Sequence, residues 1–210
     1  DIYSNISQNY RSITFNDMRI VNPSSVIDPN IQDEEGYSFD VGIRSDQTSV
    51  FNYDVSFFYL NYNNRIGEHG VKENHQAKRN RTNIGQAVIS GLGAYGEIDL
   101  IGYLNPGEDT WSGAVFNNLA LIKSAYGKSL VDGADVEGNK VEFVPDINLK
   151  TGVRIGYKTL KASFQYTYLS EQFTDATNSQ ASDVSAVFGL IPAYSIMDLC
   201  LSCQYKNVTV

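Results

Sequence analysis

The clearest pattern in the chain is an alternation of apolar and polar side chains with a period of two. In residues 160–169 the apolar set is Leu160, Ala162, Phe164, Tyr166 and Tyr168. The polar set between them is Lys161, Ser163, Gln165 and Thr167. Successive side chains of a β-strand point to opposite faces, so this segment is predicted to be a strand with one apolar and one polar face.

The same alternation recurs in six further segments along the chain. They are residues 37–44, 51–61, 92–100, 111–121, 147–157 and 197–205. No segment shows a convincing helical period of 3.6, so the pattern predicts an all-β fold. We count about eight strands, followed by the start of another at residues 207–210.

The connections between these segments alternate between short and long. The short ones are residues 45–50, 158–159 and 206–207, and the long polar ones are residues 15–35, 67–83, 127–140 and 174–189. One connection, residues 101–110, is of medium length where a short one is expected. Outer-membrane barrels combine short periplasmic turns with long extracellular loops, and their strands exceed the usual five or six residues. The alternation of short and long connections therefore predicts an antiparallel up-and-down transmembrane β-barrel.

A soluble β-sandwich is the main alternative, because its strands also alternate. The two readings assign the apolar face differently, to a second sheet in a sandwich and to lipid in a barrel. The chain shows no leader pattern at its start and no run of about 18 apolar residues, and spanning strands need neither. With 14 Tyr and 10 Phe it is rich in residues that favour strands and membrane interfaces.

The net charge, the cysteines and the histidines further limit the functions that the chain can have. The formal net charge is −8, which argues against nucleic acid as a partner. Cys200 and Cys203 fall on opposite faces of one strand, so we predict neither a disulfide nor a metal site there. The two histidines, His69 and His75, lie in one polar segment and are expected to be solvated. We predict no catalytic residue, no resident metal and no cofactor.

An ordered set of motifs resembles a known family. The motifs are NISQNYRSITFNDMRIVNPSSVIDPNIQDEEGYSFDVG (5–42), FYLNYNNRIGE (58–68), RTNIGQAVISGLGAYGEIDL (81–100), GNKVEFVPDINLKTGVRIGYK (138–158), FQYTYLSEQFTDATN (164–178) and LIPAYSIMDLCLSCQYK (190–206). In this order they resemble the TonB-dependent outer-membrane receptors, of the ferric-dicitrate (siderophore) transporter type found in Bacteroidetes. The resemblance covers nearly the whole chain.

The resemblance implies a 22-stranded barrel whose lumen is filled by an N-terminal plug. Against that pattern, residues 1–210 correspond to a C-terminal part of the barrel, a partial barrel of about eight strands. We expect the plug domain, the early strands and the final strands to be absent from this piece. The apolar face of residues 160–169 is then assigned to lipid, and its polar face to the lumen.

The resemblance also implies a function that involves no covalent chemistry. The expected activity is uptake of a ferric chelate, such as ferric citrate, across the outer membrane, with energy from the TonB–ExbB–ExbD complex acting through the plug. Expected partners are that complex, outer-membrane lipid and the chelate. Another ligand within the family (a cobalamin, a glycan or a different metal chelate) stays open, as do a passive porin-like barrel and a soluble β-sandwich binding module.

An anionic chelate has to be captured by cations and amides in extracellular loops. The candidate ligand-binding residues are Arg19, Arg65, Lys78, Arg79, Arg81 and Asn83. No family motif assigns a role to any of them, and solvated or plug-facing side chains are the competing interpretation for each.

Overall fold

The computed structural model describes residues 1–20, 23–45, 50–73, 76–130, 136–181, 189–205 and 208–209. The elements are β1 (Ile2–Arg11), β2 (Ser25–Ile27), β3 (Glu34–Arg44), β4 (Phe51–Glu73), β5 (Gln76–Asp99), α1 (Leu100–Leu104), β6 (Trp111–Ser129), β7 (Ile147–Tyr157), β8 (Leu160–Leu169), β9 (Gln172–Phe173), β10 (Leu190–Ile191), β11 (Tyr194–Tyr205) and β12 (Val208–Thr209). All of the larger elements are strands, which confirms the predicted all-β class.

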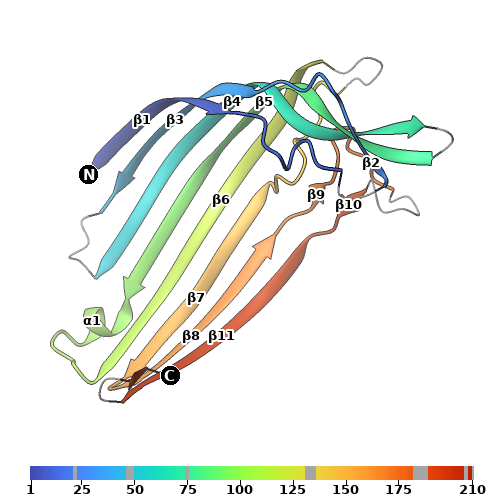
Figure 1. Cartoon of the computed structure of the whole chain (residues 1–210). Coiled ribbons are helices and arrows are strands. Elements are labelled where there is room, and N and C mark those ends of the chain that lie inside the picture. The colour runs from blue at the N-terminus through green and yellow to red at the C-terminus, as the bar shows by residue number, and fades with distance from the viewer. Residues whose placement is uncertain are drawn as a thin grey trace.

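One twisted, curved sheet contains nearly all of these strands (Figure 1). Its order is β1-β3-β4-β5-β6-β7-β8-β11-β12, with β2 attached in parallel to the outer part of β5. Neighbours along this path are antiparallel, so the sheet is an up-and-down meander, open at β1 and at β12. Eight of its strands have ten or more residues, in agreement with the predicted count. Within the described residues, the only other sheet is the small β9–β10 pair.

The strand register gathers apolar side chains on one face of the sheet. Val115 lies opposite Val153, Val153 opposite Phe164, and Phe164 opposite Leu199. These side chains are exposed, and the exposed fraction of Leu199 reaches 68%. Directly opposed residues share a face, so the row is a continuous apolar surface with no protein layer over it in the described part of the chain. A sandwich would bury this face under a second large sheet, whereas a membrane barrel presents it to lipid.

The other face of the sheet is largely polar. Asp54 lies opposite Tyr95, Tyr95 opposite Asn118, Asn118 opposite Lys150, and Lys150 opposite Thr167. This face also holds an ion pair between Glu97 and Arg154, and the guanidinium of that arginine lies 4.9 Å from the ring centroid of Phe116. The two-faced character predicted from residues 160–169 therefore extends across the whole sheet.

Among the described residues, the buried core is small and lies at the end of the sheet that bears the long loops. It contains Ile84, Ala87, Tyr126, Val136, Val141 and Ala176. Two connecting segments cover the strands there and are joined to each other. The amide of Phe143 donates to the carbonyl of Phe173 at 2.9 Å, and Asn178 exchanges hydrogen bonds with the backbone of Lys140. These contacts give the loop end a fixed shape on which a binding site can be built.

Three details differ from the sequence prediction. Residues 2–11 were not identified as a strand, but they form β1. Residues 67–83 were expected to form a loop, but β4 and β5 continue as a paired hairpin to Glu73 and Gln76. Leu100 was placed in a strand, but it begins α1, which occupies the connection of unexpected length. None of the described helices is long and apolar enough to cross a membrane. Both cysteines are free, which confirms the absence of a disulfide.

Candidate functional site

The β4–β5 hairpin positions the candidate site, because it projects beyond its neighbours at the loop end (Figure 1). The register of the hairpin shifts between Tyr62 and Ile66, and the pairing of β5 with β6 shifts between Gly85 and Ala87. Gly85 has φ 150°, and a Cβ there would lie 2.2 Å from the carbonyl oxygen of Lys128, so this irregularity requires glycine. These bulges bend the hairpin and bring its arginines against the segment that follows β1.

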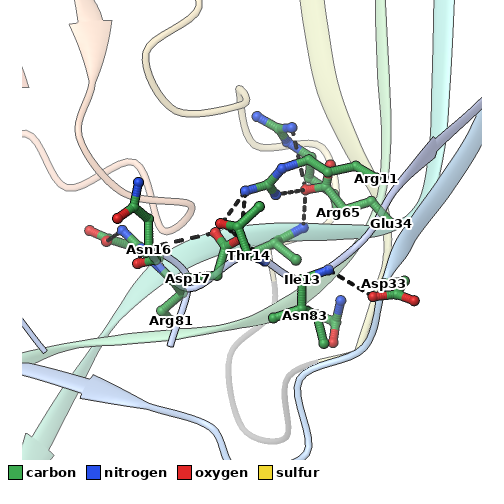
Figure 2. Close-up of polar contacts among 12 residues, drawn as sticks. Arg11, Ile13, Thr14, Asn16, Asp17, Asp33, Glu34, Arg65, Arg81 and Asn83 are labelled. Carbon is green, nitrogen blue, oxygen red and sulfur yellow. Dashed lines mark hydrogen bonds and ion pairs between the residues drawn. The ribbon is translucent and has the colours of Figure 1, made fainter. Parts of the chain in front are cut away.

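A network of ion pairs ties these elements together (Figure 2). Arg11 at the end of β1 donates to both carboxylate oxygens of Asp17, at 2.7 and 2.8 Å. Its other terminal nitrogen lies 3.3 Å from Glu34 at the start of β3. The same Glu34 oxygen accepts from the backbone amide of Ile66 at 2.7 Å and from Arg65 at 3.5 Å. Glu34 is thus a buried junction between β1, β3 and β4.

Two arginines of β5 continue the network toward solvent. Arg81 donates to Glu68 at 2.7 Å and to the carbonyl of Asn16 at 3.0 Å, while Arg79 reaches the other oxygen of Glu68 at 3.4 Å. Arg79 and Arg81 keep 27% and 33% of their side chains exposed. They therefore remain accessible to a ligand although both are paired with the same carboxylate.

The network surrounds a hollow of about 550 Å³. It is lined by Arg11, Asp17, Arg65, Ile66, Gly67, Glu68, Arg79, Arg81, Glu142, Phe143 and Val144. Four arginines and three carboxylic acids are among these lining residues, and Glu34 lies behind the wall. Both the size of the hollow and the gathering of four guanidinium groups along its lining suit a small anionic ligand.

Two carboxyl groups of the lining have shifted pKa values in opposite directions. Burial alone would raise the pKa of Asp17, but hydrogen bonds from Thr14 and Arg11 outweigh burial and hold it below its ordinary value. Burial raises the pKa of Glu142, and a hydrogen bond from the hydroxyl of Tyr126 offsets only part of that rise. Protonation of Glu142 therefore makes the hollow more positive, and Asp17 stays ionised as a fixed anchor for the arginines.

The structure brings three of the six predicted residues together, since Arg65, Arg79 and Arg81 all line the hollow. Asn83 lies on β5, like Arg79 and Arg81. Its side chain hydrogen-bonds the backbone of Gln32 and Asn64 and so holds these segments in place.

The remaining two predicted residues lie outside the hollow. Lys78 is on β5 and is not among the lining residues. Arg19 is exposed and forms no ion pair with a described residue. Apart from Arg19, the predicted residues are on strands rather than in loops, which corrects that part of the prediction, because the hairpin pairs with itself beyond the sheet.

Sequence reasoning missed the acidic half of the site and one of its arginines. Asp17, Glu34, Glu68, Glu142 and Arg11 were not candidates, because only cations and amides were sought. The expectation of a solvated histidine is wrong for His69, which is 6% exposed and contacts Asn80 through Nε2 at 3.2 Å. His75 is outside the described residues. No group of three metal-binding side chains occurs in the part of the chain that the structure describes.

Comparisons with known proteins place this geometry in a family. The model of the TonB dependent receptor-like β-barrel matches residues 1–210. No curated protein matches the chain.

Several solved structures have the same fold. The ferric citrate transporter FecA in its unliganded form is 18% identical, with a TM-score of 0.69 over 98% of this chain and 28% of that chain. The ferric yersiniabactin uptake receptor FyuA from Yersinia pestis is 17% identical, with a TM-score of 0.63 over 97% of this chain and 27% of that one. The siderophore receptor PiuA from Acinetobacter baumannii is 18% identical, with a TM-score of 0.62 over 99% and 28% of the two chains.

The chain thus spans under a third of the length of these solved structures. The sheet belongs in the outer membrane, as the family match, the shared fold and the uncovered apolar face all indicate. The family consists of receptors rather than enzymes. The chain belongs to the TonB-dependent receptor family and forms part of its outer-membrane β-barrel.

Proposed function

We propose that these 210 residues form a C-terminal part of the barrel of an outer-membrane receptor that actively imports a ferric chelate, ferric citrate or a similar siderophore. The energy would come from the TonB–ExbB–ExbD complex, acting through a plug domain inside the closed barrel. The observation that carries the proposal is the arginine-lined hollow at the loop end. The solved structures with this fold include a ferric citrate transporter, a ferric yersiniabactin uptake receptor and a siderophore receptor, which supports the same ligand class.

The chemistry of the hollow suits a chelate that presents carboxylates. Arg79 and Arg81 converge on the carboxylate of Glu68, Arg81 also lies 4.0 Å from Asp17, and both guanidinium groups stay partly exposed. A ligand carboxylate can add a charge-assisted hydrogen bond to either guanidinium without displacing Glu68. Arg65 contributes from the opposite strand, and its Nε is a buried donor with no partner among the described residues.

Binding by the purified full-length receptor tests this function. The assay is titration of ferric citrate, a ferric catecholate, a cobalamin and an oligosaccharide, each followed by calorimetry. We expect ferric citrate or another anionic ferric chelate to bind, and the double substitution Arg79→Gln and Arg81→Gln to raise its Kd by roughly tenfold or more, about 1.4 kcal/mol.

Arg154→Gln is the matched control, because that arginine is also paired with a glutamate but lies away from the hollow. Unchanged affinity in the double variant would remove these arginines from the binding site. Selective binding of the cobalamin or the oligosaccharide would replace the proposed ligand class.

A further inference from the structure

The connection between β5 and β6 is unusual for the short-turn end of the sheet, because it contains a helix. At the same end, β7 and β8 are joined by Lys158 and Thr159 alone. Helix α1 begins where the side chain of Asp99 accepts a hydrogen bond from the amide of Gly102 at 2.9 Å. Its sequence, LIGYL, contains no polar side chain except the tyrosine hydroxyl.

None of the residues in α1 is buried. The exposed fractions are 40% for Leu100, 68% for Tyr103 and 74% for Leu104. Three large apolar side chains exposed within five residues are costly in water, at roughly 25 cal/mol for each Å² of apolar surface. A contiguous patch of this kind indicates an interaction surface.

The contact of α1 with β6 shows which side of the sheet the helix occupies. Ile101 packs over Gly113, where an added Cβ would lie 2.8 Å from the Cγ1 atom of Ile101. Gly113 lies opposite Ile155 in the register, and Ile155 belongs to the apolar face. Helix α1 is therefore held against the lipid-facing side of the sheet rather than the polar side.

The patch on α1 is near further apolar groups at the same end of the sheet. Trp111 and Tyr157 are directly opposed, and their ring centroids are 4.5 Å apart. The Nζ atom of Lys158 lies 5.3 Å from the tyrosine ring. Aromatic rings beside a lysine are typical of the boundary between acyl chains and head groups. An almost wholly apolar groove lies beside them, lined by Ile155, Tyr157, Leu160, Lys161, Ala162, Leu201, Ser202 and Cys203.

We propose that α1 is a membrane-surface foot of the barrel, whose Tyr103 and Leu104 insert into the periplasmic phospholipid leaflet. Short turns lie on the periplasmic side of outer-membrane barrels, which fixes the leaflet. Lipid is the occupant because the patch continues the apolar face, and because Ile101 binds the helix to that face. The acidic side chains of Glu108 and Asp109 follow α1 and mark where the chain returns to water. The foot extends lipid contact beyond the strands and opposes rotation or tilt of the barrel.

Spin-label accessibility tests the foot in the full-length receptor. The protein is reconstituted in vesicles of phosphatidylethanolamine and phosphatidylglycerol, in a cysteine-free background that includes Cys200→Ser and Cys203→Ala. Nitroxides are placed singly by Leu104→Cys and Tyr103→Cys. Two reference labels give the accessibilities expected in lipid and in water. They are placed by Leu121→Cys on the apolar face and by Asp109→Cys in the polar turn. Collision with oxygen reports lipid, and collision with a water-soluble nickel chelate reports the aqueous phase.

We expect the ratio of oxygen to nickel accessibility at positions 103 and 104 to shift toward the value at position 121. A ratio equal to that at position 109 would overturn the proposal, since the patch would face water. Low collision rates with both reagents would also overturn it, because protein would then cover the patch. Heat-dependent migration on SDS gels confirms that each labelled barrel is assembled, and the two label positions check each other. The result does not depend on the transported ligand.

Discussion

Replacing Glu34 tests whether the ion-pair network holds the loop end together. Glu34 is 2% exposed, and a single carboxylate oxygen is close to three donors, from Arg11, Arg65 and the amide of Ile66. Glu34→Ala leaves the buried amide without its acceptor and two guanidinium groups without their shared charge. Leaving one buried donor unsatisfied costs about 1–3 kcal/mol. This cost predicts roughly 5- to 150-fold faster hydrogen exchange of the backbone amides around Ile66.

The assay is hydrogen exchange by mass spectrometry on the full-length receptor, followed in peptides that contain Ile66. Glu34→Gln keeps an acceptor for the amide but loses the charge, so we expect a smaller increase in exchange than for Glu34→Ala. Glu35→Ala is the matched control, since that neighbouring side chain is exposed on the other face of β3. Equal exchange in Glu34→Ala and the unmodified receptor would refute the reasoning that Glu34 is a structural junction.

Three further predictions concern pH, packing and lipid. Hydrogen bonds from a threonine hydroxyl and a backbone amide hold the pKa of Asp28 below its ordinary value of 3.8, so its contribution to the attachment of β2 is complete above that pH. The contribution is lost as the pH falls through the lower pKa of the folded state. Hydrogen exchange of the β2 amides should therefore speed up at low pH in the unmodified receptor but not in the Asp28→Asn variant. The same pH response in both proteins would exclude Asp28 as its source. Gly152→Ala places a Cβ 2.3 Å from a carbonyl oxygen of the next strand, whereas the nearest atom to a Cβ at Gly93 is 3.2 Å away. We expect the first substitution to cost about 1–3 kcal/mol in urea unfolding and the second to cost less; equal effects would contradict the packing argument. Leu199→Arg on the apolar face should cost about 2–4 kcal/mol in vesicles, and Asp198→Arg on the polar face should cost little; the reverse order would invert the assignment of the two faces.

Much of the fold is predictable because lipid imposes a strict period on the strands. In β8 every outward residue is apolar and every inward residue except the terminal Leu169 is polar, so the sequence alone identifies the strand and its faces. β1 was not identified as a strand because its outward row mixes Ile2 and Ile6 with Ser4 and Gln8. The outer parts of β4 and β5 extend beyond the sheet, where neither face has to be apolar, and their polar residues were therefore taken for a loop.

The site was only half predictable for a related reason. Arg79 and Arg81 were identified as cations because they stand out in a basic run. Their partner Glu68 lies on the opposite strand of the hairpin, and Glu34 is 31 residues from Arg65, so pairing depends on a register that the sequence does not display. The helix α1 is only five residues long, too short to show a helical period.

Energised uptake is the most direct test of the central claim, that this barrel belongs to an importer of ferric chelates. The measurement is accumulation of radioactive iron supplied as ferric citrate or another anionic chelate, in cells with the full-length gene and in a deletion strain. We predict uptake that requires the gene and stops when the proton gradient is collapsed or TonB is removed. Equal accumulation in the two strains for every ferric chelate, or uptake that persists without TonB, would contradict the account.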